Sequence, residues 1–242
     1  MSSGFTTYLN DQQRNGKKLL AVLIDPDKAS DDHLEALLSK SNCAYIDVIF
    51  VGGSVLTDGE IHSTISSIKK LTTLPCIIFP GSADQICNEA DGILLLSLIS
   101  GRNPDLLIGK HVESALQLHR AQIEIIPTAY ILVDGGTETT VSYISGTRPL
   151  PADKPGLIAV TALAGEQLGK ALIYMDAGSG AKNPISTDVI EKVRSFVTRP
   201  IVVGGGIKTG DGVQKAWDAG ADVVVVGNVL ETDPAFLATL RS

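Results

Sequence analysis

The sequence of 242 residues is 44% hydrophobic and 19% charged, a composition typical of a folded globular protein, which excludes a disordered chain. Its length is close to the usual size of one α/β barrel. The formal net charge of −7 argues against partners that need a basic surface, so we expect neither nucleic acid nor an anionic membrane surface among them.

The N-terminal stretch MSSGFTTYLN lacks the basic and apolar regions of a signal peptide. The longest apolar runs, such as Gly92–Leu98, are far shorter than the ~20 residues of a membrane-spanning helix. Three cysteines are present, Cys43, Cys76 and Cys87, with no metal-binding spacing, and a packing role is favoured for Cys43 and Cys76. We therefore expect a cytoplasmic protein with no integral membrane segment.

The first half of the chain alternates short apolar runs with segments of helical periodicity. Continuous apolar runs are typical of strands that are buried on both faces of a parallel sheet. Pro127 cannot donate to a sheet, so it predicts a bulge or break within the fifth strand. The predicted strands are Leu19–Ile24, Tyr45–Val51, Cys76–Phe79, Gly92–Ser97 and Ile123–Ile126 with Ala129–Val133; the predicted helices run from Ser30 or Asp31 to Ser39, over Glu60–Leu71 and over Asp105–Arg120.

The second half opens on a polar stretch, Asp134–Pro155, which contains three prolines and predicts a loop or lid with little regular structure. Helical spacing returns in Gly156–Leu168. The remaining predicted strands are Ala171–Asp176, Ile201–Val203 and Asp222–Val226, and the remaining helices are Ser186–Val197, Thr209–Ala219 and Pro234–Leu240.

Eight strands that mostly alternate with helices indicate parallel pairing, because parallel neighbours need such crossovers. We predict one α/β domain over residues 1–242, a single (β/α)8 barrel of the TIM type. An open, doubly wound sheet is the alternative architecture.

The last two strands suggest the function. Each ends in glycine and then opens a helix, with Gly204-Gly205-Gly206 after the seventh strand and Gly227-Asn228 after the eighth. Backbone N–H groups at such turns, together with helix N-termini, bind anions. In (β/α)8 barrels this pair of loops commonly holds a phosphate.

The other strand ends carry oxygen ligands and no histidine. Asp25, Asp27 and Lys28 follow the first strand, Gly53-Ser54 the second, and Tyr174, Asp176 and Gly178-Ser179-Gly180 the sixth. The four histidines fall in helices or linkers, which argues against imidazole or zinc chemistry. Carboxylate and hydroxyl ligands suit Mg²⁺, which leaves most of its coordination to water and phosphate oxygens.

With these motifs the chain resembles the geranylgeranylglyceryl phosphate synthases, in the wider family that includes the bacterial heptaprenylglyceryl phosphate synthases. The matching pieces span nearly the whole chain in order: LIDPDK at Leu23–Lys28, FVGGS at Phe50–Ser54, LLSLISGRNPDLLIGKHV at Leu95–Val112, YMDAGSGA at Tyr174–Ala181, VGGGI at Val203–Ile207 and VGNVLE at Val226–Glu231.

The resemblance implies a barrel enzyme that joins sn-glycerol 1-phosphate to a prenyl diphosphate, geranylgeranyl diphosphate, and releases diphosphate with Mg²⁺, in ether phospholipid biosynthesis. It implies that Asp25 and Ser54 bind Mg²⁺, and that Asp176 and Tyr174 are catalytic, with a carboxylate taking the proton of the glycerol hydroxyl. The implied glycerol phosphate site comprises Tyr174, Met175, Asp176, Ala177, Gly178, Ser179, Gly180, Gly205, Gly206, Gly227 and Asn228. Because many barrels of this kind are oligomers, we expect a homo-oligomer.

Two positions depart from the family pattern. The family usually has Glu where this chain has Asp176, which is one methylene shorter and puts the efficiency of proton removal in doubt. Relatives often carry an aromatic residue where this chain has Leu106, and we hypothesise that this position limits the length of the prenyl tail.

Two other functions are compatible with phosphate-binding loops. An isomerase or aldolase of phosphorylated metabolites needs paired acid and base residues or a Schiff-base lysine, and no lysine falls in the predicted fourth to sixth strands. A non-catalytic barrel that only binds a phosphometabolite is the second alternative. Taken singly, Asp25 before Pro26 and the Gly204–Gly206 run also fit simple turns.

Overall fold

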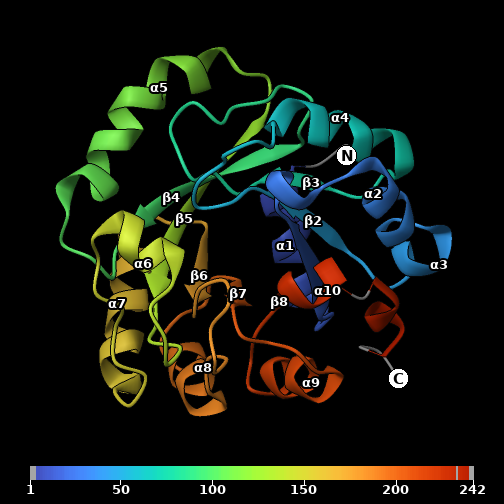
Figure 1. Cartoon of the computed structure of the whole chain (residues 1–242). Coiled ribbons are helices and arrows are strands. Elements are labelled where there is room, and N and C mark those ends of the chain that lie inside the picture. Colours follow the sequence, from blue (N-terminus) through green and yellow to red (C-terminus); the bar gives the residue numbers. More distant parts are fainter. Residues whose placement is uncertain (1–3, 233, 240–242) are drawn as a thin grey trace.

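Eight parallel strands close into a barrel in their order along the chain (Figure 1). The computed structural model describes residues 4–232 and 234–239. Because all of the strands run the same way, their carboxyl ends lie at one end of the barrel. The strands are β1 (Leu19–Ile24), β2 (Val48–Val51), β3 (Cys76–Ile78), β4 (Gly92–Leu98), β5 (Glu124–Leu132), β6 (Leu172–Asp176), β7 (Ile201–Gly204) and β8 (Val223–Val226). The predicted closed barrel is confirmed.

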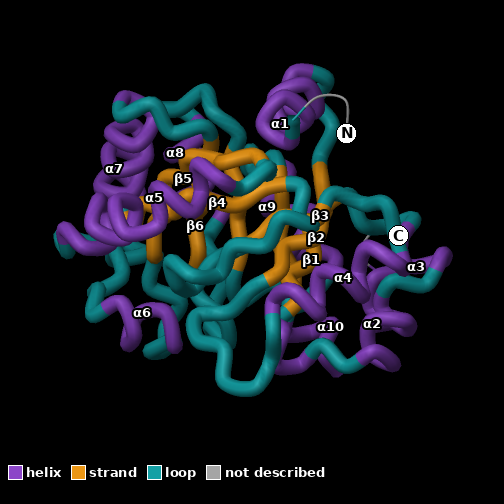
Figure 2. Tube along the Cα trace, turned by 90° about the horizontal axis from the view of Figure 1, so that it is seen from above, coloured by secondary structure: helices purple, strands orange, loops and turns teal. Residues whose placement is uncertain are grey.

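Side chains alternate between the barrel interior and the layer under the helices. The interior cluster contains Phe50, Tyr130 and Tyr174, while their strand neighbours pack outward against the helices. Both faces are thus apolar, which is why the strands read as continuous apolar runs. The amino end is closed by α1 (Phe5–Arg14), whose Phe5 and Leu9 join the interior cluster. Figure 2 shows α1 at one end of the molecule, with α6 and α10 at the opposite end.

Most crossovers are helical, and several of the helices begin at or next to the residue where the sequence predicts a helix start. Ser30 accepts from the backbone N–H of His33, Ser186 from Val189 and Thr209 from Gly212, each at the first turn of its helix. The helices are α2 (Asp31–Leu37), α3 (Lys40–Cys43), α4 (Ile61–Leu71), α5 (Lys110–Arg120), α6 (Thr140–Ser145), α7 (Pro155–Gln167), α8 (Thr187–Arg194), α9 (Gly210–Asp218) and α10 (Asn228–Thr232), with a π-helical turn at Asp105–Gly109 before α5.

Three sequence predictions are wrong in detail. Residues 134–155 hold a helix, α6, where Ser142 Oγ accepts from the backbone N–H of Thr139 and Gly146 ends the helix at φ 57°. The fifth strand is unbroken at Pro127, because its carbonyl still accepts from Ala171. The predicted closing helix is 3₁₀ over Pro234–Thr239, and Leu240 falls outside the described residues.

The crossover between β3 and β4 differs from the others. Residues 79–91, all of them described, contain neither helix nor strand. Without a helix there, an apolar cavity lies between β4 and α5. None of the described helices is long and apolar enough to cross a bilayer.

Candidate active site

A cavity of about 400 Å³ opens at the carboxyl ends of the strands. It brings together residues at or just after the carboxyl ends of β1, β2, β3, β5, β6, β7 and β8, from Leu23 to Glu231 in the sequence. Of the residues predicted for the site, it contains Asp25, Ser54, Tyr174, Asp176, Ser179, Gly180, Gly205, Gly206, Gly227 and Asn228. The predicted phosphate loops and the predicted metal ligands therefore share one cavity.

Three predicted residues of the sixth strand do not line this cavity. Met175 and Ala177 alternate with Tyr174 and Asp176, and their side chains belong to the core outside the barrel. Gly178 contributes through its backbone, because its N–H donates to Asp176 Oδ1 at 2.7 Å. The period of two in a strand accounts for this division.

Asp176 is the carboxylate at the centre of the cavity. Its Oδ2 accepts from the Tyr130 hydroxyl at 2.6 Å, and its Oδ1 accepts from Gly178. Burial raises the pKa of Asp176 above its ordinary 3.8, while the two donors act in the opposite direction. Each oxygen of this carboxylate thus accepts one hydrogen bond from the protein, and burial raises the basicity of the group.

Tyr130 was not predicted from the sequence. It lies on β5 directly beside Tyr174 on β6, and both rings point into the barrel. Desolvation raises the pKa of each phenol well above 10, so both stay protonated. Tyr130 lies two residues from the end of β5. The alternation of side chains along the strand could have identified it as an inward-facing phenol near the site.

Four aromatic rings pack together here, and three of them, Phe79, Tyr130 and Tyr174, line the cavity. Phe79 lies edge-on to Tyr130 and Tyr174, with ring centroids 5.7 Å and 5.1 Å apart, and Phe50 contacts Tyr174 at 6.2 Å. Such packing fixes the rings and leaves little freedom for the Tyr130 hydroxyl. Tyr174 is 1% exposed, so its role as a catalytic residue stays a prediction.

The glycine turn after β7 is conformationally demanding. Gly205 has φ 83° and Gly206 φ 73°, which favour glycine. A Cβ on Gly205 would lie 2.6 Å from the Gly178 nitrogen and 2.8 Å from Asp176 Oδ1. The turn after β8 joins the site through Ser179, whose hydroxyl donates to Asn228 Oδ1 at 3.0 Å. Close backbone approach, rather than a simple turn, explains Gly205.

Replacing Gly205 by Ala should lower the free energy of unfolding by about 1–3 kcal/mol from backbone strain, and further because the new methyl meets the turn after β6. Gly180→Ala is the matched control, since Gly180 also has positive φ (79°) but open space around its Cβ position. Urea denaturation of both variants measures the difference. Equal losses would contradict the close-approach argument.

Asp25 and Ser54 lie on adjacent strand ends in the same cavity. Asp25 Oδ1 accepts from the Asp27 N–H at 3.1 Å, and Oδ2 lies 3.9 Å from Lys28 Nζ. Burial raises the pKa of Asp25. Lys28 Nζ also donates to the carboxylate of Glu231 in α10, 2.8 Å away. The role of Lys28 as a diphosphate contact stays a prediction.

The donor set here fits Mg²⁺ and does not form a complete protein cage. One carboxylate and one hydroxyl, with room for water and phosphate oxygens, is the usual protein share of a magnesium site. Across residues 4–232 and 234–239, no three side chains of His, Cys, Asp or Glu gather closely enough to hold an ion by themselves. A metal at Asp25 and Ser54 would therefore need a ligand supplied by the substrate.

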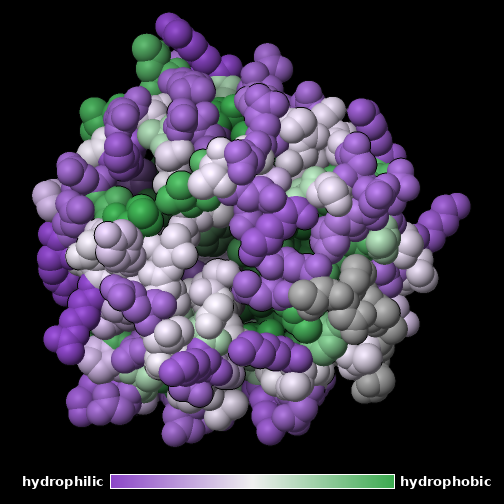
Figure 3. All heavy atoms as spheres, viewed as in Figure 1, coloured by the Kyte–Doolittle hydropathy of each residue, from purple (hydrophilic) through white to green (hydrophobic). Residues whose placement is uncertain are grey.

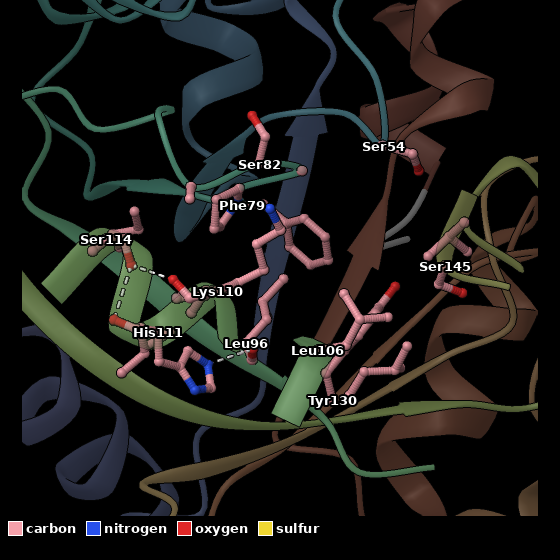
Figure 4. Close-up of a pocket in the computed structure, with 18 of the residues that line it drawn as sticks. Ser54, Phe79, Ser82, Leu96, Leu106, Lys110, His111, Ser114, Tyr130 and Ser145 are labelled. Atoms are coloured by element: carbon pink, nitrogen blue, oxygen red, sulfur yellow. Dashed lines mark hydrogen bonds between the residues drawn. The ribbon is translucent and has the colours of Figure 1, made fainter. Parts of the chain in front are cut away.

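A second cavity, of about 310 Å³, adjoins the first (Figure 4). Its lining is mostly apolar side chains from β4, α5 and the residues after β3, and it includes Leu106. His111 lines it too, where its Nε2 bonds to the Leu96 carbonyl at 2.9 Å, a packing role. The two cavities share Gly53, Ser54, Phe79, Tyr130 and Val141. Val141 comes from α6, which the sequence did not predict.

Comparisons with known proteins find relatives that match nearly the whole chain. The model of the PcrB family matches residues 12–241. The chain is 51% identical over 236 residues to the geranylgeranylglyceryl phosphate synthase of Spirosoma linguale, covering 98% of this chain and 95% of that protein. It is 39% identical to the enzyme of that name in Pyrococcus abyssi, covering 93% and 89%. The crystal structure of (S)-3-O-geranylgeranylglyceryl phosphate synthase from Thermoplasma acidophilum in complex with its substrate sn-glycerol-1-phosphate superposes with a TM-score of 0.90 at 32% identity, covering 98% and 96%. The chain therefore belongs to the PcrB family, together with these geranylgeranylglyceryl phosphate synthases.

Proposed function

We propose that this prenyltransferase joins geranylgeranyl diphosphate to sn-glycerol 1-phosphate through an ether bond and releases diphosphate, with Mg²⁺ as cofactor, in the biosynthesis of ether phospholipids. The observation that carries the proposal is the meeting of two unlike cavities. One is polar, with glycine turns and the Asp176 carboxylate, and the other is apolar and lies along β4. A phosphorylated alcohol and an isoprenoid chain need that pair of environments.

The polar cavity suits glycerol phosphate. Backbone N–H groups at Gly205, Gly206, Gly227 and Asn228 would hold the phosphate. A glycerol hydroxyl would then face Asp176, which orients it and accepts its proton as the C–O bond forms. Tyr130 holds the other carboxylate oxygen in place.

The apolar cavity suits the isoprenoid, with the diphosphate at the boundary near Ser54. Mg²⁺, held by Asp25 and Ser54, would neutralise charge on the departing diphosphate. The rings of Phe79 and Tyr130, which line both cavities, would face the allylic carbon, where positive charge develops and aromatic faces are stabilising.

Diphosphate release with sn-glycerol 1-phosphate, geranylgeranyl diphosphate and Mg²⁺ tests the proposal, with the sn-3 enantiomer as control. We expect turnover with the sn-1 form alone. Saturable glycerol phosphate binding without turnover would favour the non-catalytic barrel. An aldolase is disfavoured because β4, β5 and β6, described in full, carry no lysine.

Leu106→Trp should shift preference toward shorter prenyl diphosphates, because Leu106 lines the apolar cavity and the larger indole would fill part of it. Relative kcat/KM for diphosphates of increasing chain length measures the shift. Leu168→Trp is the control, since it makes the same change at a residue that is 71% exposed at the end of α7 and lines neither cavity. An unchanged preference in Leu106→Trp would exclude this residue as a limit on length.

A homo-oligomer belongs to the same proposal. Ile108, Val112 and Leu116 form an exposed apolar stripe at the start of and along α5, and Figure 3 shows apolar atoms on the side of the molecule where α5 and α6 lie. Contact with another copy would cover such a stripe. Light scattering on the purified protein measures the mass directly.

A further inference from the structure

Asp27 makes a dense set of hydrogen bonds that the proposed chemistry does not use. It lies in the 3₁₀ turn after β1, and its carboxylate reaches across to the loop after β2. There it accepts from the backbone N–H groups of Thr57, Asp58 and Gly59, the closest at 2.6 Å, and from the Thr57 hydroxyl at 2.8 Å. One side chain thus holds three successive residues of a neighbouring loop.

The two segments that Asp27 joins are those that carry the proposed metal ligands. On its own side, the Asp27 N–H donates to Asp25 Oδ1 at 3.1 Å. On the other side, Asp27 bonds to residues 57–59, which lie in the same loop after β2 as Gly53 and Ser54. The segments are also in backbone contact, because a Cβ on Gly59 would lie 2.2 Å from the Pro26 carbonyl carbon. A Cβ on Gly53 would lie 3.2 Å from Asp25 Oδ1.

We infer that Asp27 is a positioning residue for the metal site: it sets the distance and orientation between Asp25 and Ser54 without itself binding the ion. The inference rests on the proposed function, since it presumes that these two residues hold Mg²⁺. The Asp27 carboxylate bonds to the loop that carries Ser54, and so acts on the position of Ser54. The backbone N–H of Asp27 bonds to Asp25 and orients it. Groups that orient metal ligands in this way typically affect metal affinity by about 10- to 100-fold when they are removed.

The chain offers a matched control far from the site. The Glu166 carboxylate accepts from the Thr198 N–H and hydroxyl, both at 2.7 Å, and so holds a loop at the amino end of the barrel. Asp27→Asn and Glu166→Gln therefore make the same chemical change to a carboxylate that anchors a loop. A general effect on stability acts in both variants, whereas an effect on metal geometry acts in Asp27→Asn alone.

The test measures Mn²⁺ binding by electron paramagnetic resonance in the presence of inorganic diphosphate, which supplies phosphate oxygens as ligands. Binding is the loss of the free Mn²⁺ signal beyond that of a protein-free sample, for the full-length wild type and both variants. We expect Asp27→Asn to bind about 10- to 100-fold more weakly, and Glu166→Gln to bind as the wild type does. In turnover, Asp27→Asn should need a correspondingly higher Mg²⁺ concentration for half-maximal rate, with the KM for glycerol phosphate unchanged at saturating Mg²⁺.

Thr57→Val keeps the test decisive if Asp27→Asn does not fold, since it removes one hydroxyl donor and no charge. It should weaken Mn²⁺ binding by a smaller factor. Wild-type affinity in both Asp27→Asn and Thr57→Val, or equal loss in Glu166→Gln, would overturn the inference. If neither the wild type nor Asp25→Asn binds Mn²⁺, the proposed metal site is wrong, and so is the inference that rests on it.

Discussion

Replacing Asp176 by Asn should lower kcat by about 100- to 10,000-fold, the usual contribution of a general base. The amide keeps the shape of the side chain and its contact with Tyr130 but cannot accept the glycerol proton. The KM for glycerol phosphate should change less, because the glycine turns hold the phosphate end. Steady-state kinetics with both substrates measures the two effects. Wild-type kcat in this variant would exclude Asp176 as the base.

The pH dependence of kcat/KM provides the companion test. Because burial raises the pKa of Asp176 above 3.8, the ionised base is lost on acidification at a higher pH than for an exposed aspartate. Tyr130→Phe removes a donor that favours the ionised form, so the acid limb should move to still higher pH. Asp176→Asn should have no such limb. Asp176→Glu restores the residue usual in the family and should keep the limb.

Asp25→Asn should lower turnover by about 100-fold or more, because metal stabilisation of a departing phosphate contributes several kcal/mol to the transition state. Chelation of Mg²⁺ from the wild type should have the same effect, reversed by added Mg²⁺. Rates measured against Mg²⁺ concentration separate loss of affinity from loss of chemistry.

The control for Asp25→Asn is Asp188→Asn, the same chemical change at an exposed carboxylate in the first turn of α8. It should leave turnover and the Mg²⁺ dependence unchanged. Full activity of Asp25→Asn at ordinary Mg²⁺ concentrations, or of chelated wild type, would show that the reaction proceeds without this metal site.

The barrel could be predicted because its signals are local. Strands buried on both faces leave continuous apolar runs, and Ser30, Ser186 and Thr209 mark helix starts by their own capping bonds. α6 could not be predicted in the same way. It lies among prolines and polar residues, and a bridge from Val133 to Leu150 closes the segment that contains it. That pairing depends on the barrel already being formed.

The cavity residues that could be predicted from the sequence are those at or directly after a strand end. The glycine turns, Asp25 and Asp176 are examples. The bond from Tyr130 to Asp176 could not be predicted, because it joins two strands 46 positions apart and depends on their register. The apolar cavity depends on the helix absent between β3 and β4 and on the place of α5, both of which are tertiary features. Met175 and Ala177 belong to the same contiguous motif, but alternation places their side chains in the core outside the barrel, so their part in the site stays a prediction.

The missing helix after β3 has a consequence for how this barrel can diversify. The apolar cavity and the proposed metal ligands come from residues 25–145, whereas the glycine turns and Asp176 lie within residues 174–228. In the proposed reaction, each half of the chain would thus serve mainly one reactant. Substitutions in the first half would then remodel the hydrocarbon specificity while the alcohol half is kept intact. Chimeras joined between β5 and β6 would combine tail and acceptor preferences as long as Tyr130 is kept to bond Asp176.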